Sequence, residues 1–221
     1  MKTKQKIFTR FIIAMVVLGI VFFLPARTFK YWEAWLYLAI IFGCATGVIL
    51  FFLRNDPGLL ERRMKTKENV KEQKLIIRLA WFLFVPIYVI PGFDKFYGWS
   101  HIPAYAVIIS AVMVLLGYII VIKVFKENSY ASRVIETDST QKVISTGPYA
   151  LVRHPMYSGM MLMYGFTPLA LGSYWALTGT ISLYVLMVAR MFSEEKFLAE
   201  NLEGYKEYLL KIKYRIIPGI W

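Results

Sequence analysis

Six long apolar segments divide this chain of 221 residues, and they constrain its fold more than any other feature. They cover residues 11–26, 32–53, about 75–93, 102–125, 156–172 and 174–192. A helix needs roughly 20 apolar residues, and about 17 at least, to cross a bilayer. The sequence therefore predicts an all-α, polytopic integral membrane protein of about six transmembrane helices. The number falls to five if 75–93, which Pro86 and Pro91 interrupt, does not cross.

The composition supports a membrane protein. Hydrophobic residues make up 58% of the chain and charged residues 18%, which is more apolar surface than a soluble domain of this size can bury. Cys44 is the only cysteine, so the sequence excludes an intramolecular disulfide and a multi-cysteine metal site. Two histidines that form no HxxxH pair do not suggest zinc, and we expect no metal.

The basic residues alternate in number from one connection to the next. The N-terminus, the 54–78 and 123–153 connections and the tail from Arg190 together hold 23 lysines and arginines, and the other three connections hold 3. Cytoplasmic loops carry such an excess, so we expect both termini and the two long loops in the cytoplasm. The net charge of +12 then reflects topology and attraction to anionic lipids, and no nucleic-acid partner is needed to explain it.

The stretch STGPYALVRHPMYSGMM, residues 145–161, places charged residues where the fifth segment enters the membrane. Pro155 suits the first turn of a helix, and the amides and positive dipole of a helix start can hold an anion. A hairpin of the last two segments would bring Arg153 and His154 close to the stretch from Arg190 to Glu195. Taken alone, Arg153 and His154 can equally be interface anchors.

The tail carries a second polar cluster. Arg190 and Glu194 are four residues apart and so share one helical face, although a solvated surface pair has the same spacing. Leucines and a tyrosine at helical spacing predict an amphipathic tail helix, with Gly204 at a bend. Glu136 stands in a polar loop that continues to a predicted turn at Gly147–Pro148.

These pieces together resemble the isoprenylcysteine carboxyl methyltransferase family over roughly residues 115–221. The resemblance rests on NSYAS, Glu136, QKVISTGPYALVRHPMYSG, Arg190 with Glu194–Glu195, GYKEY and RIIPGIW, in that order. It implies membrane helices over 1–100, and over 101–221 a methyltransferase core with a cytoplasmic pocket for S-adenosyl-L-methionine (SAM). The lipidic or prenylated-cysteine substrate would enter from the bilayer.

The resemblance also implies roles for single residues. Arg190 and Arg153 are the expected catalytic residues, with Arg190 holding the acceptor carboxylate. The expected cofactor contacts are Glu136, Gln141, Lys142, Val143, Ile144, Tyr149, His154, Pro155, Met156, Tyr157, Glu194 and Glu195. Two departures from the family pattern stand out: Gln141 replaces a histidine that many relatives have, and the loop before Tyr205 is one residue shorter.

The chemistry agrees with this inventory. A carboxylate acceptor is already ionised at pH 7 and needs no general base, so alignment and exclusion of water would supply most of the catalysis. An amine acceptor would need a base, and His154 or Glu195 would be the candidates.

Three other functions stay open at this stage. A membrane sterol-type reductase that binds NADPH has a similar C-terminal hairpin, but Met156 stands where those enzymes have Asn. A methyltransferase acting on a phospholipid amine or another small lipid fits the same residues. A membrane scaffold that docks partners on the basic 54–78 connection is the non-enzymatic alternative.

Overall fold

The computed structural model describes residues 2–64, 71–132 and 141–221, and every regular element in those ranges is helical. This confirms the all-α prediction. The elements, in chain order, are α1 (Lys2–Ala26), α2 (Trp32–Asn55), α3 (Pro57–Met64), α4 (Lys71–Tyr97), α5 (Ala104–Glu127), the 3₁₀ helix η1 (Gly147–Ala150), α6 (Pro155–Ala170), α7 (Leu177–Asn201) and α8 (Tyr205–Lys211).

All six predicted apolar segments are helices. Within the described ranges, four helices are long and apolar enough to cross a membrane: α1 from Lys4, α2, α4 from Arg78, and α5. Both prolines of the third segment lie inside α4, which continues through them to Tyr97. The helix α6 has only 16 residues, and neither it nor α7 is among those four. That α6 and α7 also cross stays a prediction.

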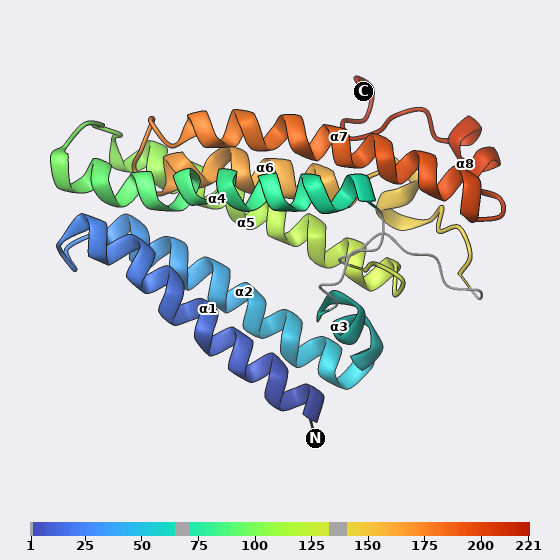
Figure 1. Cartoon of the computed structure of the whole chain (residues 1–221), viewed down its shortest axis with the longest axis horizontal. Helices are drawn as coiled ribbons and strands as arrows, with labels where there is room; N and C mark the ends of the chain where they lie inside the picture. The colour runs from blue at the N-terminus through green and yellow to red at the C-terminus, as the bar shows by residue number, and fades with distance from the viewer. Residues whose placement is uncertain (1, 65–70, 133–140) are drawn as a thin grey trace.

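The long helices form two groups (Figure 1). The helices α4, α5, α6 and α7 lie alongside one another, while α1 and α2 form a pair that diverges from them toward the N-terminus. The short helix α3 lies at the end that also carries α8. The helix α1 packs on α4, and α4 packs on α7. The predicted boundary between residues 100 and 101 falls between α4 and α5; the two-domain division stays a prediction.

Glycines allow the closest helix pair, α5 and α6, to approach backbone to backbone. A Cβ atom on Gly117 would lie 2.6 Å from the carbonyl oxygen of Gly159, and one on Gly159 would lie 2.7 Å from the carbonyl oxygen of Gly117. No side chain fits at such distances, and small residues at helix crossings are typical of membrane bundles. The crossing fixes the position of α6 and therefore of the residues at its start.

The tail folds back against the bundle. Gly204 has a φ of +79° and separates α7 from α8, which confirms the predicted bend. Tyr205, Tyr208 and Ile212 are buried there and pack with Val143 and the end of α7. The chain then runs along the start of α6, where the amides of Arg153 and His154 donate to the carbonyl oxygens of Tyr214 and Arg215 (2.9 and 2.8 Å).

The opposite end of the bundle carries a buried polar cluster. The carboxylate of Asp94 accepts hydrogen bonds from the amide and hydroxyl of Ser100 (both 2.6 Å) and from the hydroxyl of Ser173 (2.5 Å). Lys95 pairs with Glu33 at 3.0 Å. These contacts tie the end of α4 to the start of α2 and to the turn between α6 and α7.

Exposed aromatic residues surround this opposite end. They come from the start of α2, the end of α4, the start of α5 and the connections after α4 and α6: Trp32, Trp35, Tyr97, Trp99, Tyr105, Tyr174 and Trp175. Tryptophan and tyrosine are enriched where a membrane meets water, because their rings are apolar and their N–H or O–H groups polar. The aromatic residues therefore mark one membrane interface at this end.

Candidate functional site

A cavity of about 700 Å³ opens at the end of the bundle that carries α8. This volume lies in the usual range for small-molecule sites. Its walls come from α1, α3, α4, α6, α7, α8 and the segments between α5 and α6. One part is polar and includes Arg63, Gln141, Arg190 and Glu194; the other is apolar and is lined by Phe84, Met160, Leu183, Leu186 and Met187.

Most of the predicted site residues line this cavity. They are Gln141, Lys142, Val143, Ile144, Tyr149, Arg153, His154, Pro155, Met156, Tyr157, Arg190 and Glu194. Glu136 lies outside the described residues. Glu195 is buried and is not among the lining residues. The roles of all these residues in binding and catalysis stay predictions.

Arg190 and Glu194 lie one turn apart on α7 and both face the cavity. The hydroxyl of Tyr157, from the first turn of α6, donates to Glu194 Oε2 at 2.9 Å. The same hydroxyl also hydrogen-bonds Arg190. The predicted proximity of the start of α6 to the Arg190–Glu195 stretch is therefore confirmed. The phenol of Tyr157 thus contacts both a cation, Arg190, and an anion, Glu194, at the wall of the cavity.

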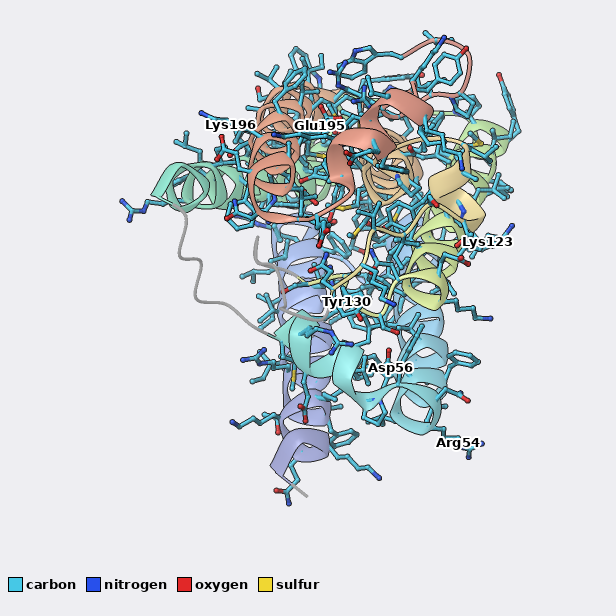
Figure 2. All side chains as sticks on the ribbon, turned by 90° about the vertical axis from the view of Figure 1, so that its right-hand side faces the viewer. Arg54, Asp56, Lys123, Tyr130, Glu195 and Lys196 are labelled. Carbon is cyan, nitrogen blue, oxygen red and sulfur yellow. The ribbon has the colours of Figure 1, made fainter. Side chains whose placement is uncertain are left out.

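Glu195 faces the other way from Glu194 and is held by three basic side chains. Its Oε1 lies 3.1 Å from Arg153 Nη1 and 3.2 Å from His154 Nε2, and its Oε2 lies 3.2 Å from Arg215 Nε. In the view onto this end, Glu195 lies toward the neighbouring helices while Lys196 projects outward (Figure 2). We call Glu195 and its three partners the Glu195 cluster: Glu195, Arg153, His154 and Arg215.

The Glu195 cluster keeps its carboxylate ionised. Burial tends to raise the pKa of Glu195, but the hydrogen bond and charge of His154, the charge of Arg153 and the hydrogen bond of Arg215 outweigh it, so the pKa lies below its ordinary value. Both carboxylate oxygens are already engaged, and the cluster locks the orientation of Arg153 and His154 at the cavity wall. Glu195 therefore holds Arg153 and His154 in place, and its predicted contact with a cofactor stays a prediction.

The start of α6 is open toward the cavity. Pro155 has no amide proton, and His154 makes no side-chain cap to the helix. The first amides of a helix have no partner within it, and here those are the amides of Met156 and Tyr157. The hydroxyl of Ser158 donates to the carbonyl of Ile216 at 2.6 Å, which fastens the C-terminal segment to the outer side of the turn.

Tyrosines build the rim of the polar part. The Tyr149 hydroxyl accepts a hydrogen bond from Asn128 Nδ2 at 2.9 Å, and the Tyr208 hydroxyl donates to the Tyr149 carbonyl at 2.9 Å. Burial is the main reason why the pKa of Tyr149 rises to about 12, so its hydroxyl keeps its proton at neutral pH. The predicted turn at Gly147–Pro148 is the start of η1, which carries this tyrosine.

Sequence reasoning missed several lining residues. Asn128, Tyr130 and Ser132 belong to the NSYAS motif, which was a signal for the pocket although no role was attached to its residues. Arg63 and the apolar residues Leu18, Phe84 and Tyr88 come from the N-terminal half. Arg63 stands among the basic residues of the 54–78 connection, where a topology signal masks any binding role.

Comparisons with known proteins bear on the fold and on the class of protein. Residues 105–204, which hold α5, α6 and α7, match the family model described as phospholipid methyltransferase. The solved structure of the eukaryotic intramembrane Ras methyltransferase ICMT, an isoprenylcysteine carboxyl methyltransferase, is similar in fold, with a TM-score of 0.52 and 18% identity over 92% of this chain and 74% of that one. No curated protein sequence matches the chain significantly. The family match and the shared fold together support a membrane methyltransferase that resembles the isoprenylcysteine carboxyl methyltransferases.

Proposed function

We propose that this protein transfers a methyl group from SAM to the carboxylate of a lipidic acceptor, such as a prenylated cysteine, at the membrane surface. One observation carries the proposal. A single cavity joins a polar part, with Arg190, Glu194 and the open start of α6, to an apolar part between α4, α6 and α7. Such a cavity suits a reaction between a charged, water-soluble donor and an acceptor with a hydrocarbon chain.

The residues of the polar part fit the groups of SAM. Glu194 can meet the α-ammonium or the ribose hydroxyls, and the amides of Met156 and Tyr157 can meet the carboxylate. Tyr149, Met156 and Met160 provide aromatic and thioether surface for the adenine and the sulfonium. Bound there, SAM would supply an electrophilic methyl group on sulfur.

Arg190, which lines the cavity, is the proposed partner of the acceptor carboxylate. Its guanidinium can hold a carboxylate through two parallel hydrogen bonds, and its hydrogen bond with Tyr157 restrains it. Methyl transfer forms a carbon–oxygen bond and breaks a carbon–sulfur bond, whose electron pair stays on sulfur. No proton moves, so the chain needs to align the two groups and exclude water. Alignment can contribute about 7–11 kcal/mol to lowering the barrier.

The distribution of charge supports a cytoplasmic site. The basic N-terminus, the basic connection around α3 and the basic tail lie at the end with α8 and the cavity. The aromatic residues lie at the opposite end, where lysines and arginines are few. The positive-inside rule then orients the protein with both termini and the active site in the cytoplasm.

A phospholipid amine is the second candidate acceptor, because the matching family model is described as phospholipid methyltransferase. An amine must lose a proton before or during methylation, so a base is required. Glu195 cannot serve readily, since three basic side chains hold its carboxylate. His154, the other candidate base, lines the cavity.

The first test is isothermal calorimetry of the detergent-purified protein with S-adenosylhomocysteine (SAH). We expect micromolar binding that Glu194→Ala and His154→Ala weaken at least about tenfold, the value of one lost charge-assisted hydrogen bond. Arg190→Ala should keep the Kd within about twofold, because Arg190 serves the acceptor. Lys196→Ala, which changes an exposed neighbour, is the matched control. Binding of NADPH without SAH would instead indicate the reductase.

The acceptor is tested by radiolabelled methyl transfer from SAM. One arm contains an N-acylated S-prenyl cysteine, and the other contains vesicles of phosphatidylethanolamine. Base-labile label on the prenyl cysteine indicates a methyl ester, and we expect Arg190→Ala to lower that rate about 100-fold or more while SAH binding persists. Label found only in the phospholipid would favour the amine acceptor.

A further inference from the structure

Arg63 brings a charge from the N-terminal half of the chain into the polar part of the cavity. It is the seventh residue of α3, outside the segments that suggested a methyltransferase. Its Nη1 donates to the carbonyl oxygen of Ser132 at 2.9 Å and lies 4.0 Å from Met156 Sδ. Its guanidinium also lies over the ring of Phe125, 5.0 Å from the centroid. Arg63 is thus held beside the open start of α6.

The helix α3 that presents Arg63 is itself well anchored. Its start is capped by Asp56, whose Oδ1 accepts from the amide of Leu59 at 3.0 Å. Leu59 is fully buried and Leu60 nearly so, in a cluster with Phe52 and Phe125. Arg62 Nε donates to the carbonyl oxygen of Ser129 at 2.6 Å. A guanidinium on such a base is already oriented before a ligand arrives, which reduces the entropy lost on binding.

Two residues of opposite charge, Glu194 and Arg63, line the same cavity as Tyr149, one from α7 and the other from α3. Both charges act on Tyr149. Burial is the largest cause of its raised pKa; beyond that, the charge of Glu194 raises the pKa and the charge of Arg63 lowers it. An amino-acid zwitterion carries an ammonium and a carboxylate a few ångströms apart, so its site needs both an anion and a cation.

We propose that Arg63 binds the α-carboxylate of the methyl donor, while Glu194, from another wall of the same cavity, meets the α-ammonium. The inference rests on the proposed SAM-dependent function and adds a residue from the N-terminal helices to the donor site. The amides at the start of α6 assist Arg63 from the neighbouring wall, because Met156 is in contact with the guanidinium. The N-terminal half then contributes to binding the donor as well as to spanning the membrane.

The test compares two ligands that differ in the group Arg63 is proposed to bind. SAH carries the amino-acid moiety, and 5′-methylthioadenosine shares the thioether, ribose and adenine but lacks it. By calorimetry, Arg63→Met should raise the Kd for SAH about 10- to 100-fold, as expected for a hydrogen bond to a charged group, and leave the Kd for methylthioadenosine within about twofold. Arg54→Met, which removes an exposed arginine in the last turn of α2 that does not line the cavity, should leave both values unchanged.

A second variant keeps the test decisive if Arg63→Met does not fold. Arg63→Lys retains the charge but loses the planar two-pronged donor, so we expect a smaller, SAH-selective loss of about 3- to 10-fold. Equal weakening of both ligands would mean that Arg63 only shapes the pocket, and unchanged binding of both would mean that it does not reach the donor. Either result overturns the inference.

Two further outcomes separate this inference from the proposed function. If Arg63→Met spares SAH but weakens binding of a short-chain phosphatidylethanolamine, the guanidinium holds an acceptor phosphate and the inference is wrong. If the wild-type protein binds neither SAH nor methylthioadenosine, the proposed function fails, and the inference fails with it. Selective loss in the Arg63 variants is the result that supports both.

Discussion

Both ends of the helical bundle bury a carboxylate, but only one of these carboxylates stands beside a cavity. Asp94, at the end with the aromatic residues, is 1% exposed and is satisfied by neutral donors from Ser100 and Ser173. Glu195, at the α8 end, is 8% exposed and is satisfied by the basic groups of Arg153, His154 and Arg215. Both clusters connect helices that are distant in sequence.

The difference lies in the neighbours of each carboxylate. Glu194, the residue before Glu195 on α7, faces the cavity. The residues around Asp94 do not line it. A buried carboxylate alone therefore does not mark a functional site. What marks it is a second carboxylate, one residue away, that faces space large enough for a ligand. The Glu195 cluster builds the wall on which that arrangement depends.

The largest expected effect is on stability, from Glu195→Ala. The substitution leaves Arg153 and His154 buried without their anion, and breaking a buried ion pair in this way costs about 3–5 kcal/mol in the free energy of unfolding. Thermal unfolding in detergent measures it. We also expect weaker SAH binding, because Arg153 and His154 line the cavity. Glu200→Ala, at an exposed position of the same helix, should change stability by less than about 0.5 kcal/mol.

The matching substitution at the opposite end is Asp94→Ala. It removes the acceptor of three hydrogen bonds and leaves the amide of Ser100 and two hydroxyls to find other partners, for a loss of about 2 kcal/mol. The Kd for SAH in the folded protein should stay within about twofold of wild type. A clear loss of SAH binding would show that the two ends are coupled and would break the comparison.

The sequence predicted the helices well, because apolar length and periodicity are local signals. The helix bounds differ in places. The sixth apolar segment ends at 192, and the structure joins it to the first part of the predicted tail helix as one helix, α7, which ends at Asn201; Leu198 and Ala199 pack there against α8. Likewise α1 begins within the basic leader, at Lys2.

The site was predicted less evenly. Residues 141–144 and the start of α6 were placed by the motif order, and they do line the cavity. Which of the two glutamates, Glu194 or Glu195, faces the cavity was not predictable, because it depends on Arg215 and on the path of the tail after Gly204. No local pattern in the sequence pointed to Arg63 as a site residue, because its proposed role depends on a hydrogen bond to Ser132, which is 69 residues away. Long-range contacts of this kind are not encoded in local pattern.

The Glu195 cluster also makes stability depend on pH. The pKa of Glu195 is below its ordinary value of 4.5 in the folded protein, so the stabilisation that it contributes is complete above about pH 4.5 and is lost as the pH falls below it toward the folded pKa. Unfolding temperatures recorded from pH 7 to pH 3 should fall more steeply in the wild type than in Glu195→Gln, which cannot titrate. Parallel curves would contradict a depressed pKa.

The smallest expected effect concerns the two partly exposed cations, Lys95 with Glu33 and Arg215 with Glu195. The two pairs resemble each other in side-chain exposure: 31% for Lys95 and 11% for Glu33, against 28% for Arg215 and 10% for Glu195. Lys95→Met removes the only basic group described within ion-pair distance of Glu33 and should cost about 1 kcal/mol, whereas Arg215→Met leaves Arg153 and His154 on Glu195 and should cost about half as much. If Arg215→Met is the more damaging, the tail segment and not the remaining cations holds Glu195 in place. In that case SAH binding should weaken along with stability, because the wall of the cavity would then depend on the path of the tail.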